Sequence, residues 1–169
     1  MITIRRYAEF GCDFPDDTIW DAEETSIVQT GGKNLAESIA ELTTRFGCVI
    51  NELEDNLEHC WECRFSYEGL ELGFHVYHAE PCILIVDQPL GFKRHFPLYC
   101  HVLMELNQAM RRDGRFHNLE WHTYDGTREG KEAYEVPVVG DIPEIDEIKQ
   151  KPSFLKRLFG ARKARPEIE

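Results

Sequence analysis

Residues 60–77 read C-W-E-C-R-F-S-Y-E-G-L-E-L-G-F-H-V-Y, and the alternation within this stretch decides the fold. Apolar side chains at every second position are typical of β-strands that bury one face. Glu68-Gly69 separates two such strands, and glycine tolerates the positive φ that a two-residue hairpin turn needs. We therefore predict an antiparallel hairpin. Its core-facing side chains are expected to be Trp61, Cys63, Phe65, Tyr67, Leu70, Leu72, Phe74 and Val76.

The same stretch holds a C-x-x-C pair, Cys60 and Cys63, with His59, His75 and His78 nearby in the sequence. Structural zinc sites place such pairs in tight turns and combine them with two further ligands. On a strand, positions 60 and 63 point to opposite faces, and a thioredoxin-type pair would open a helix instead. We therefore favour a core thiol at 63 and a partly exposed thiol at 60, and expect no metal, cofactor or catalytic set. The other cysteines are each isolated in the sequence: Cys12, Cys48, Cys82 and Cys100.

Helical periodicity flanks the hairpin on both sides. The first predicted helix has Asn34 and Glu37 in the positions of a capping box, and Gly47 supplies its end. The second is predicted to have Pro97 in its first turn and to end at 113–114. The expected buried stripes are Leu35, Ile39, Leu42 and Phe46 in the first helix, and Leu98, Val102, Leu106 and Ala109, with Tyr99, Leu103 and Met110 beside them, in the second.

Further strands are predicted at Ile2–Tyr7, around Ser26–Gln29, and at Cys82–Val86, which is apolar on both faces as a central strand would be. In a last strand, Leu119 and Trp121 are expected to face inward, with Glu120 and His122 outward. The order is strand, strand, helix, four strands, helix, strand. It predicts an α+β fold, an antiparallel sheet of about five to seven strands with two helices packed on one face.

Three segments together carry a family resemblance: G-K-N-L-A-E-S-I at 32–39, W-E-C-R-F at 61–65 and L-E-W-H at 119–122. Residues 31–122 resemble a family of small acidic bacterial proteins of unknown function, in which a glycine is common where Cys60 stands here. The order of elements is also similar, at the level of fold, to type III secretion chaperones and YbjN-like proteins. The resemblance implies a small bacterial α+β protein that binds another protein.

Charge divides the chain near Pro143–Pro152. Residues 149–169 carry seven basic and two acidic residues, a net of +5, whereas the first 148 residues carry 12 basic and 29 acidic, a net of −17. We predict a single α+β domain over 1–142, followed by a linker and basic amphipathic tail over 143–169. The tail could lie on an anionic membrane, bind a partner, pack on the acidic body or remain solvated. Its candidate contact residues are Phe154, Leu155, Lys156, Arg157, Leu158, Phe159, Arg162 and Lys163.

Composition narrows the class of protein. A formal charge of −12 over 169 residues disfavours binding to nucleic acid. No apolar run is long enough for a membrane span, and the N-terminus MITIRRYAEF lacks the apolar core of a secretory signal. Six cysteines in such a chain are typical of reduced thiols, so we expect a cytoplasmic protein, with the tail able to reach the inner face of the membrane.

No catalytic motif stands out. A nucleophile elbow, a dinucleotide loop, a Walker loop and a calcium loop are all missing, and the acidic pairs Asp16-Asp17 and Glu23-Glu24 fit a solvated face. The sequence favours a non-catalytic protein-interaction module, chaperone-like or immunity-like, that meets a basic partner through a sheet edge or face. Two alternatives stay open: a peripheral membrane protein held by residues 153–165, and a metal-dependent enzyme that uses Cys60, Cys63 and nearby histidines.

Overall fold

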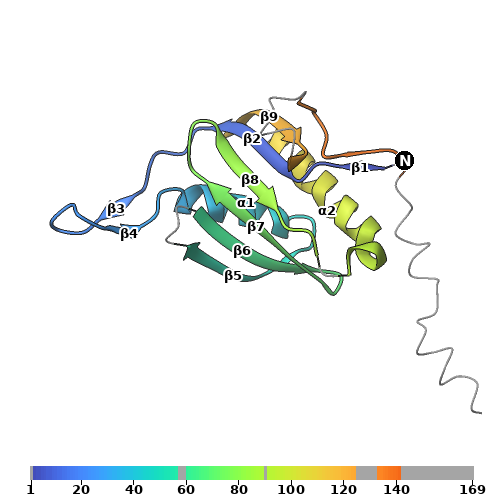
Figure 1. The fold of residues 1–169 in the computed structure, drawn as a ribbon, viewed down its shortest axis with the longest axis horizontal. Coiled ribbons are helices and arrows are strands. Elements are labelled where there is room, and N and C mark those ends of the chain that lie inside the picture. The colour runs from blue at the N-terminus through green and yellow to red at the C-terminus, as the bar shows by residue number, and fades with distance from the viewer. Residues whose placement is uncertain (1, 57–59, 90, 125–132, 142–169) are drawn as a thin grey trace, which may run out of the picture.

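The computed structural model describes residues 2–56, 60–89, 91–124 and 133–141, so the predicted tail contacts at 153–165 lie outside the described residues. A six-stranded antiparallel sheet in the order β5-β6-β7-β8-β2-β9 forms the centre of the molecule (Figure 1). Its strands are β2 (Tyr7–Cys12), β5 (Val49–Asn56), β6 (Cys60–Tyr67), β7 (Leu70–Tyr77), β8 (Cys82–Val86) and β9 (Phe116–His122).

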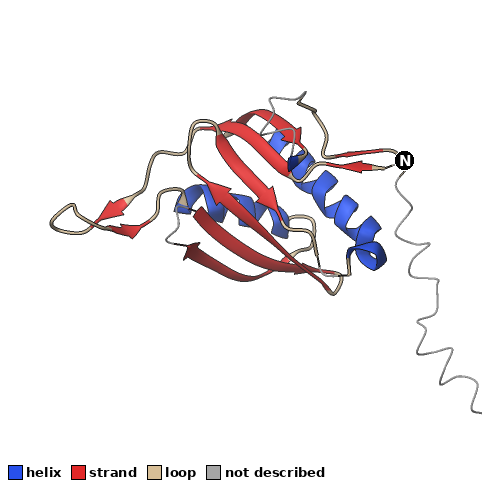
Figure 2. Cartoon of the chain, viewed as in Figure 1, coloured by secondary structure: helices blue, strands red, loops and turns tan. Residues whose placement is uncertain are grey.

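Two helices, α1 (Lys33–Thr44) and α2 (Phe92–Arg112), pack on one face of this sheet (Figure 2), which confirms the predicted α+β class. Among the described residues, no helix has the length and apolar character needed to cross a membrane. Two small sheets complete the fold. They are formed by β1 (Thr3–Ile4) with β10 (Val138–Val139), and by β3 (Ile19–Trp20) with β4 (Ile27–Gln29).

The β6–β7 hairpin forms as predicted. Its strands pair without interruption from Trp61↔Val76 to Tyr67↔Leu70, and the turn residues have positive φ. Seven of the eight predicted core side chains are buried, and the eighth, Tyr67, is half-buried and stacks on His101 with ring centroids 5.5 Å apart. The partly exposed thiol predicted at position 60 is wrong, because Cys60 is buried. Strands pair on both sides of β6, so position 60 lies inside the sheet and not at its edge.

The start of α1 differs from the predicted capping box. The N-cap is Gly32, which has no side chain, and Asn34 lies inside the helix without capping it. Asp17 takes that role from a distant segment. Its carboxylate accepts hydrogen bonds from the backbone N–H groups of Gly32, Lys33 (3.2 Å) and Asn34 (2.8 Å). These groups have no partner within the helix, and the positive end of the helix dipole favours a carboxylate there.

The second helix also begins earlier than predicted. It starts at Phe92, which places Pro97 in the second turn. The ring of Phe92 packs edge-on against Phe96 and Tyr99, and these contacts hold the extra turn. The predicted stripe is turned by about one position, since Leu98 and Ala109 are only half-buried. The fully buried large side chains of this helix are Tyr99, Leu103, Leu106 and Met110.

Two predictions near the N-terminal strand are corrected. The strand expected at Ile2–Tyr7 is displaced: only Thr3–Ile4 forms β1, and the long strand begins at Tyr7 and pairs between β8 and β9. His122 was expected to face outward into solvent, but it is 6% exposed. It pairs with Tyr7, and its Nε2 atom lies 3.9 Å from the carboxylate of Glu9, so its neighbours on β2 cover it.

Replacing Asp17 with alanine is expected to lower the free energy of unfolding by about 1–2 kcal/mol, because three N–H groups at the start of α1 lose their acceptor. Urea denaturation of the full chain measures the change. Glu23→Ala is the matched control, since Glu23 is an exposed carboxylate of the same segment. A loss in D17A no larger than in E23A would contradict the assignment of Asp17 as the cap.

A second prediction concerns Asp113, at the end of α2. Its carboxylate accepts hydrogen bonds from the guanidinium of Arg115 at 2.9 and 2.6 Å, which lowers the pKa of Asp113 from 3.8 to about 2. Because this pKa lies below the unfolded value, the pair stabilises the fold above about pH 4 and the contribution is lost as the pH falls toward 2. Asp113→Asn should therefore cost about 1 kcal/mol at pH 7 and little at pH 2.

Urea denaturation at both pH values tests this, with Glu120→Gln, an exposed carboxylate on β9, as the control. An equal loss for D113N at pH 7 and pH 2 would show that the carboxylate's charge does not contribute.

Candidate functional site

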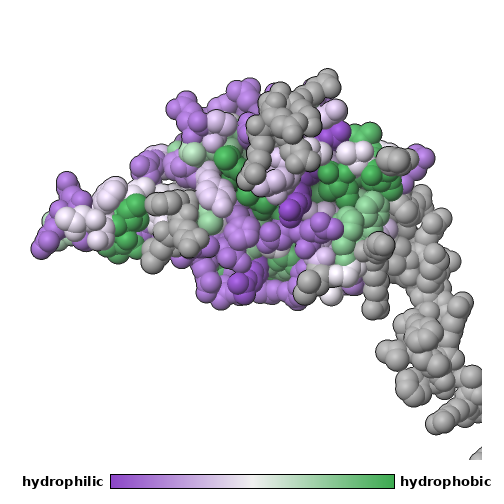
Figure 3. Space-filling model, viewed as in Figure 1, coloured by the Kyte–Doolittle hydropathy of each residue, from purple (hydrophilic) through white to green (hydrophobic). Residues whose placement is uncertain are grey.

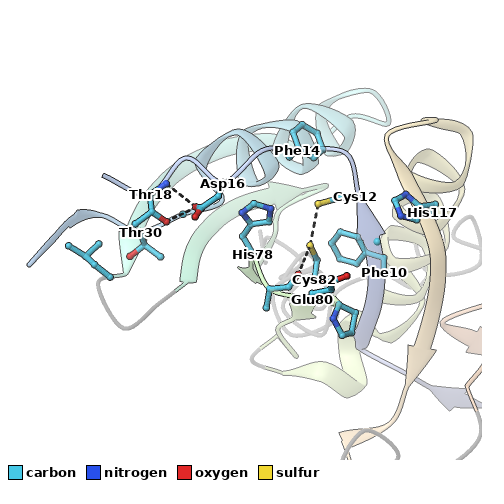
Figure 4. A pocket seen from close by; sticks show the side chains of 15 residues that line it. Phe10, Cys12, Phe14, Asp16, Thr18, Thr30, His78, Glu80, Cys82 and His117 are labelled. Atoms are coloured by element: carbon cyan, nitrogen blue, oxygen red, sulfur yellow. Dashed lines mark hydrogen bonds between the residues drawn. The ribbon is translucent and has the colours of Figure 1, made fainter. Parts of the chain in front are cut away.

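A cavity of about 660 Å³ lies where the end of β2, the β7–β8 connection and the base of the β3–β4 hairpin meet. Figure 4 shows the side chains that line it. The cavity therefore brings together residues 10–31, residues 78–82 and His117 of β9, three regions that are far apart in the sequence. Those with chemically active side chains are Cys12, Asp16, Thr18, His78, Glu80, Cys82 and His117.

Two thiols meet in one wall of this cavity. The Sγ atoms of Cys12 and Cys82 lie 3.2 Å apart, and the Cys82 thiol also donates to the carbonyl of Ala79 at 3.3 Å. The pairing of β2 with β8 creates this contact: Phe10 is the partner of Cys82 in the ladder, and Cys12 lies two residues further along β2. Cys82 is buried, whereas Cys12 is half-buried at the rim.

His78 lies beside the thiols and connects them to an acidic loop. An imidazole nitrogen of His78 and the sulfurs of Cys12 and Cys82 all lie within 4.8 Å of one another. Carboxylate oxygens of Asp16 and Asp17 form a second such group with His78. Figure 4 shows the His78 ring between Asp16 on one side and the thiols on the other. His78 is thus the residue that the two groups share.

Gly32 makes room for this histidine. A Cβ atom at position 32 would come within 2.7 Å of the Cβ of His78, and the backbone there has a φ of +97°. A larger residue would be strained and would also displace the imidazole. The Gly31-Gly32 pair therefore serves both the start of α1 and the wall of the cavity.

The acid–base states of these groups limit their chemistry. Burial raises the pKa of the Cys82 thiol to about 12, and the contact with Cys12 adds to the shift. Hydrogen bonds from Thr18 lower the pKa of Asp16. At neutral pH, Cys82 is therefore a neutral thiol and Asp16 a carboxylate. A neutral buried thiol is a poor nucleophile, and a metal ion could bind Cys82 only by displacing its proton.

Among the described residues, those of the metal-enzyme alternative do not come together in this way. Cys60 and Cys63 are three positions apart on a regularly paired strand, so they point to opposite faces, as predicted. His75 instead lies 3.2 Å from the carboxylate of Asp87. His59 is outside the described residues. Two cysteines alone therefore do not form a centre on β6.

Cys12 and Cys82 are isolated in the sequence but lie in contact in the fold. They are 70 residues apart in sequence, and only the insertion of β2 beside β8 brings them into contact. Sequence patterns carry no signal for that neighbour relation, because it joins strands that do not follow one another. The one local hint is the segment H-A-E-P-C at 78–82, which places two ligand-type side chains at the ends of one short connection.

We expect Cys12 to be the fastest-reacting thiol when iodoacetamide is added to the native, metal-free chain at neutral pH. It is the one half-exposed cysteine of the six, and burial raises the pKa of Cys48, Cys63 and Cys82 to about 12. Peptide mass spectrometry at increasing times measures the order. Cys12→Ser should remove the fast reaction, whereas Cys48→Ser should leave it unchanged. Earlier labelling of any other cysteine would contradict the described burial.

Comparisons of the chain with family models, curated proteins and solved structures find no match in any of the three. The family resemblance noted from residues 31–122 therefore stays a prediction, and the function rests on the chain's own geometry.

Proposed function

We propose that this chain is a non-catalytic binding protein whose β3–β4 hairpin, residues 16–32, contacts a basic surface of another protein. We call this hairpin the arm. Three large apolar side chains on it are exposed: Ile19 by 50%, Trp20 by 52% and Val28 by 60%. This exposure is the observation that carries the proposal. Apolar side chains grouped on the surface and surrounded by polar residues mark contact sites, and tryptophan is enriched among the residues that dominate binding energy.

The position of the arm makes these side chains accessible. In Figure 1 the arm extends away from the six-stranded sheet and the two helices, and Figure 3 shows apolar surface on it between hydrophilic groups. The core of the molecule is formed elsewhere, between the helices and the sheet. The apolar residues of the arm are therefore not needed to complete that core, and a partner can cover them.

Charge indicates what kind of partner the arm would bind. The arm and the three residues before it, 13–32 in all, contain six acidic residues and no lysine, arginine or histidine. A surface of this sign attracts a basic surface and repels acidic ones, which raises the association rate and suppresses wrong partners. The acidic residues of the segment are Asp13, Asp16, Asp17, Asp21, Glu23 and Glu24.

Local hydrogen bonds order the arm before any partner binds. The carboxylate of Asp21 accepts from the backbone N–H of Thr25 at 2.8 Å and from its hydroxyl at 3.0 Å, which closes the tip. The side chain of Gln29 donates to the carbonyl of Asp17 at 3.0 Å, which closes the base. A preformed binding segment loses less conformational entropy on association than a disordered one.

The open face of the sheet extends the negative surface. Glu52, Glu54 and Glu62 lie on neighbouring strands there, with Arg64 as their nearby cation. The hydrogen bond and the charge of Glu52 raise the pKa of Glu54, a sign that the carboxylates crowd one another. A basic partner that reaches from the arm onto β5 and β6 would relieve this repulsion.

Site-specific photo-cross-linking tests the proposal. A photoreactive amino acid is placed at position 20 of the full chain, produced in its source cells, and position 41 on α1 serves as the control because the side chain of Glu41 is 60% exposed. We expect one discrete adduct from position 20 and none from position 41. With the purified partner, Trp20→Ala should weaken binding at least about tenfold, as for a central aromatic contact, whereas Glu41→Ala should not.

Rising salt should also weaken the complex, because the attraction is partly electrostatic. An adduct that maps to the chain's own residues 149–169 or to a second copy of the chain would contradict the proposed partner. So would a purified partner that binds W20A and the wild-type chain equally.

A further inference from the structure

We infer that Cys12, His78 and Cys82 bind one Zn²⁺ ion, with its fourth coordination position open to the cavity. The inference does not rest on the partner proposed for the arm. It rests on three ligand-type atoms that lie within 4.8 Å of one another: one from the end of β2, one from the β7–β8 connection and one from the first residue of β8.

The distances suit a tetrahedral ion after a small adjustment. Zinc bonds of about 2.3 Å to sulfur and about 2.0 Å to nitrogen place neighbouring ligand atoms roughly 3.5–3.8 Å apart. The two sulfurs here are 3.2 Å apart, so they would separate by about half an ångström. Cys12 is at the end of its strand and half-buried, which leaves its side chain able to move.

The ligand types select the ion. Two thiolates and an imidazole suit zinc and soft ions such as Cu⁺, whereas magnesium and calcium prefer oxygen ligands. Three protein ligands with an open fourth position are typical of zinc sites that bind a water or a further ligand. All three ligands line one cavity, so such a ligand has space to enter.

Asp16 is placed to orient the histidine. Its carboxylate lies near His78, on the side of the ring away from the thiols (Figure 4). Thr18 fixes the carboxylate by donating its backbone N–H at 3.0 Å and its hydroxyl at 2.6 Å. Metal-binding histidines commonly donate their other N–H to a carboxylate, which sets the tautomer and the ring orientation. Asp16 is therefore a positioning residue.

A disulfide between the same two cysteines is the competing explanation. It would account for the contact of Cys12 with Cys82, since closing 3.2 Å to a bond of about 2.05 Å needs only a small movement. It would not account for the imidazole beside the sulfurs or the carboxylate behind the imidazole. The metal site uses all four groups.

The test uses the full chain, reduced, stripped with a chelator and titrated with Zn²⁺ against a competing indicator. We expect one zinc per chain by elemental analysis, and thiolate-to-metal charge-transfer absorption when Co²⁺ replaces zinc. Cys12→Ser and His78→Ala should each lose the charge-transfer band or most of the affinity. Cys48→Ser and His75→Ala are the matched controls, because neither residue lies in the cluster, and both should bind as the wild type does.

Asp16→Asn distinguishes a positioning role of Asp16 from a purely structural one. It should weaken zinc binding about tenfold while keeping the cobalt spectrum, because the ligands remain and only their support is lost. Circular dichroism of each variant confirms folding, and Cys12, being half-buried, is the ligand least needed by the core.

Equal zinc affinity in C12S and the wild type would overturn the inference. So would a reduced chain that takes up Cu⁺ but no zinc, or a chain isolated with Cys12 and Cys82 joined as a disulfide that still takes up no zinc after reduction.

Discussion

The antiparallel pairing of β2 with β8 is the interaction on which the rest of the molecule depends. It inserts β2 between β8 and β9. The sheet formed by β5, β6, β7 and β8 therefore continues through β2 to β9. Ala8 and Phe10 on β2 are fully buried: Ala8 pairs with Leu84 and Trp121, and the ring of Phe10 packs against that of Phe116. The same pairing carries Cys12 to Cys82 and directs the chain beyond β2 into the arm.

Adjacent carboxylates then link three parts of the molecule. Asp17 accepts hydrogen bonds from the first N–H groups of α1, while Asp16 lies against His78 in the cavity. Thr18 holds the carboxylate of Asp16 and the helix start holds that of Asp17, while each keeps an oxygen within 4.8 Å of a His78 ring nitrogen. The helix, the cavity and the base of the arm consequently share one short loop. A substitution that moves this loop would therefore affect the helix start, the cavity and the base of the arm together.

The spacing of apolar residues in the sequence predicted the helices and strands that have a strong apolar pattern or mainly local contacts. The hairpin at 60–77 follows from alternation and a glycine turn, and the body of α1 and the central strand at 82–86 follow in the same way. The α1 cap, the start of α2 and the Cys12–Cys82 contact did not follow. The cap depends on Asp17 and the thiol contact on two strands that do not follow one another in sequence. The early start of α2 depends instead on ring contacts of Phe92 with Phe96 and Tyr99. Local propensity does not reveal which strand lies beside which, and the candidate site is made by that choice.

The two proposals meet at residues 16–20. An ion held by Cys12, His78 and Cys82 would fix the imidazole, and the imidazole would in turn hold Asp16, whose carboxylate is already bonded to Thr18. Trp20, the central contact of the proposed arm surface, is two residues further along the chain. Filling the cavity would restrict the base of the arm while leaving the core between helices and sheet unchanged. A segment that is ordered before it binds loses less entropy on association. Binding of the ion would therefore increase the affinity of the arm for its partner.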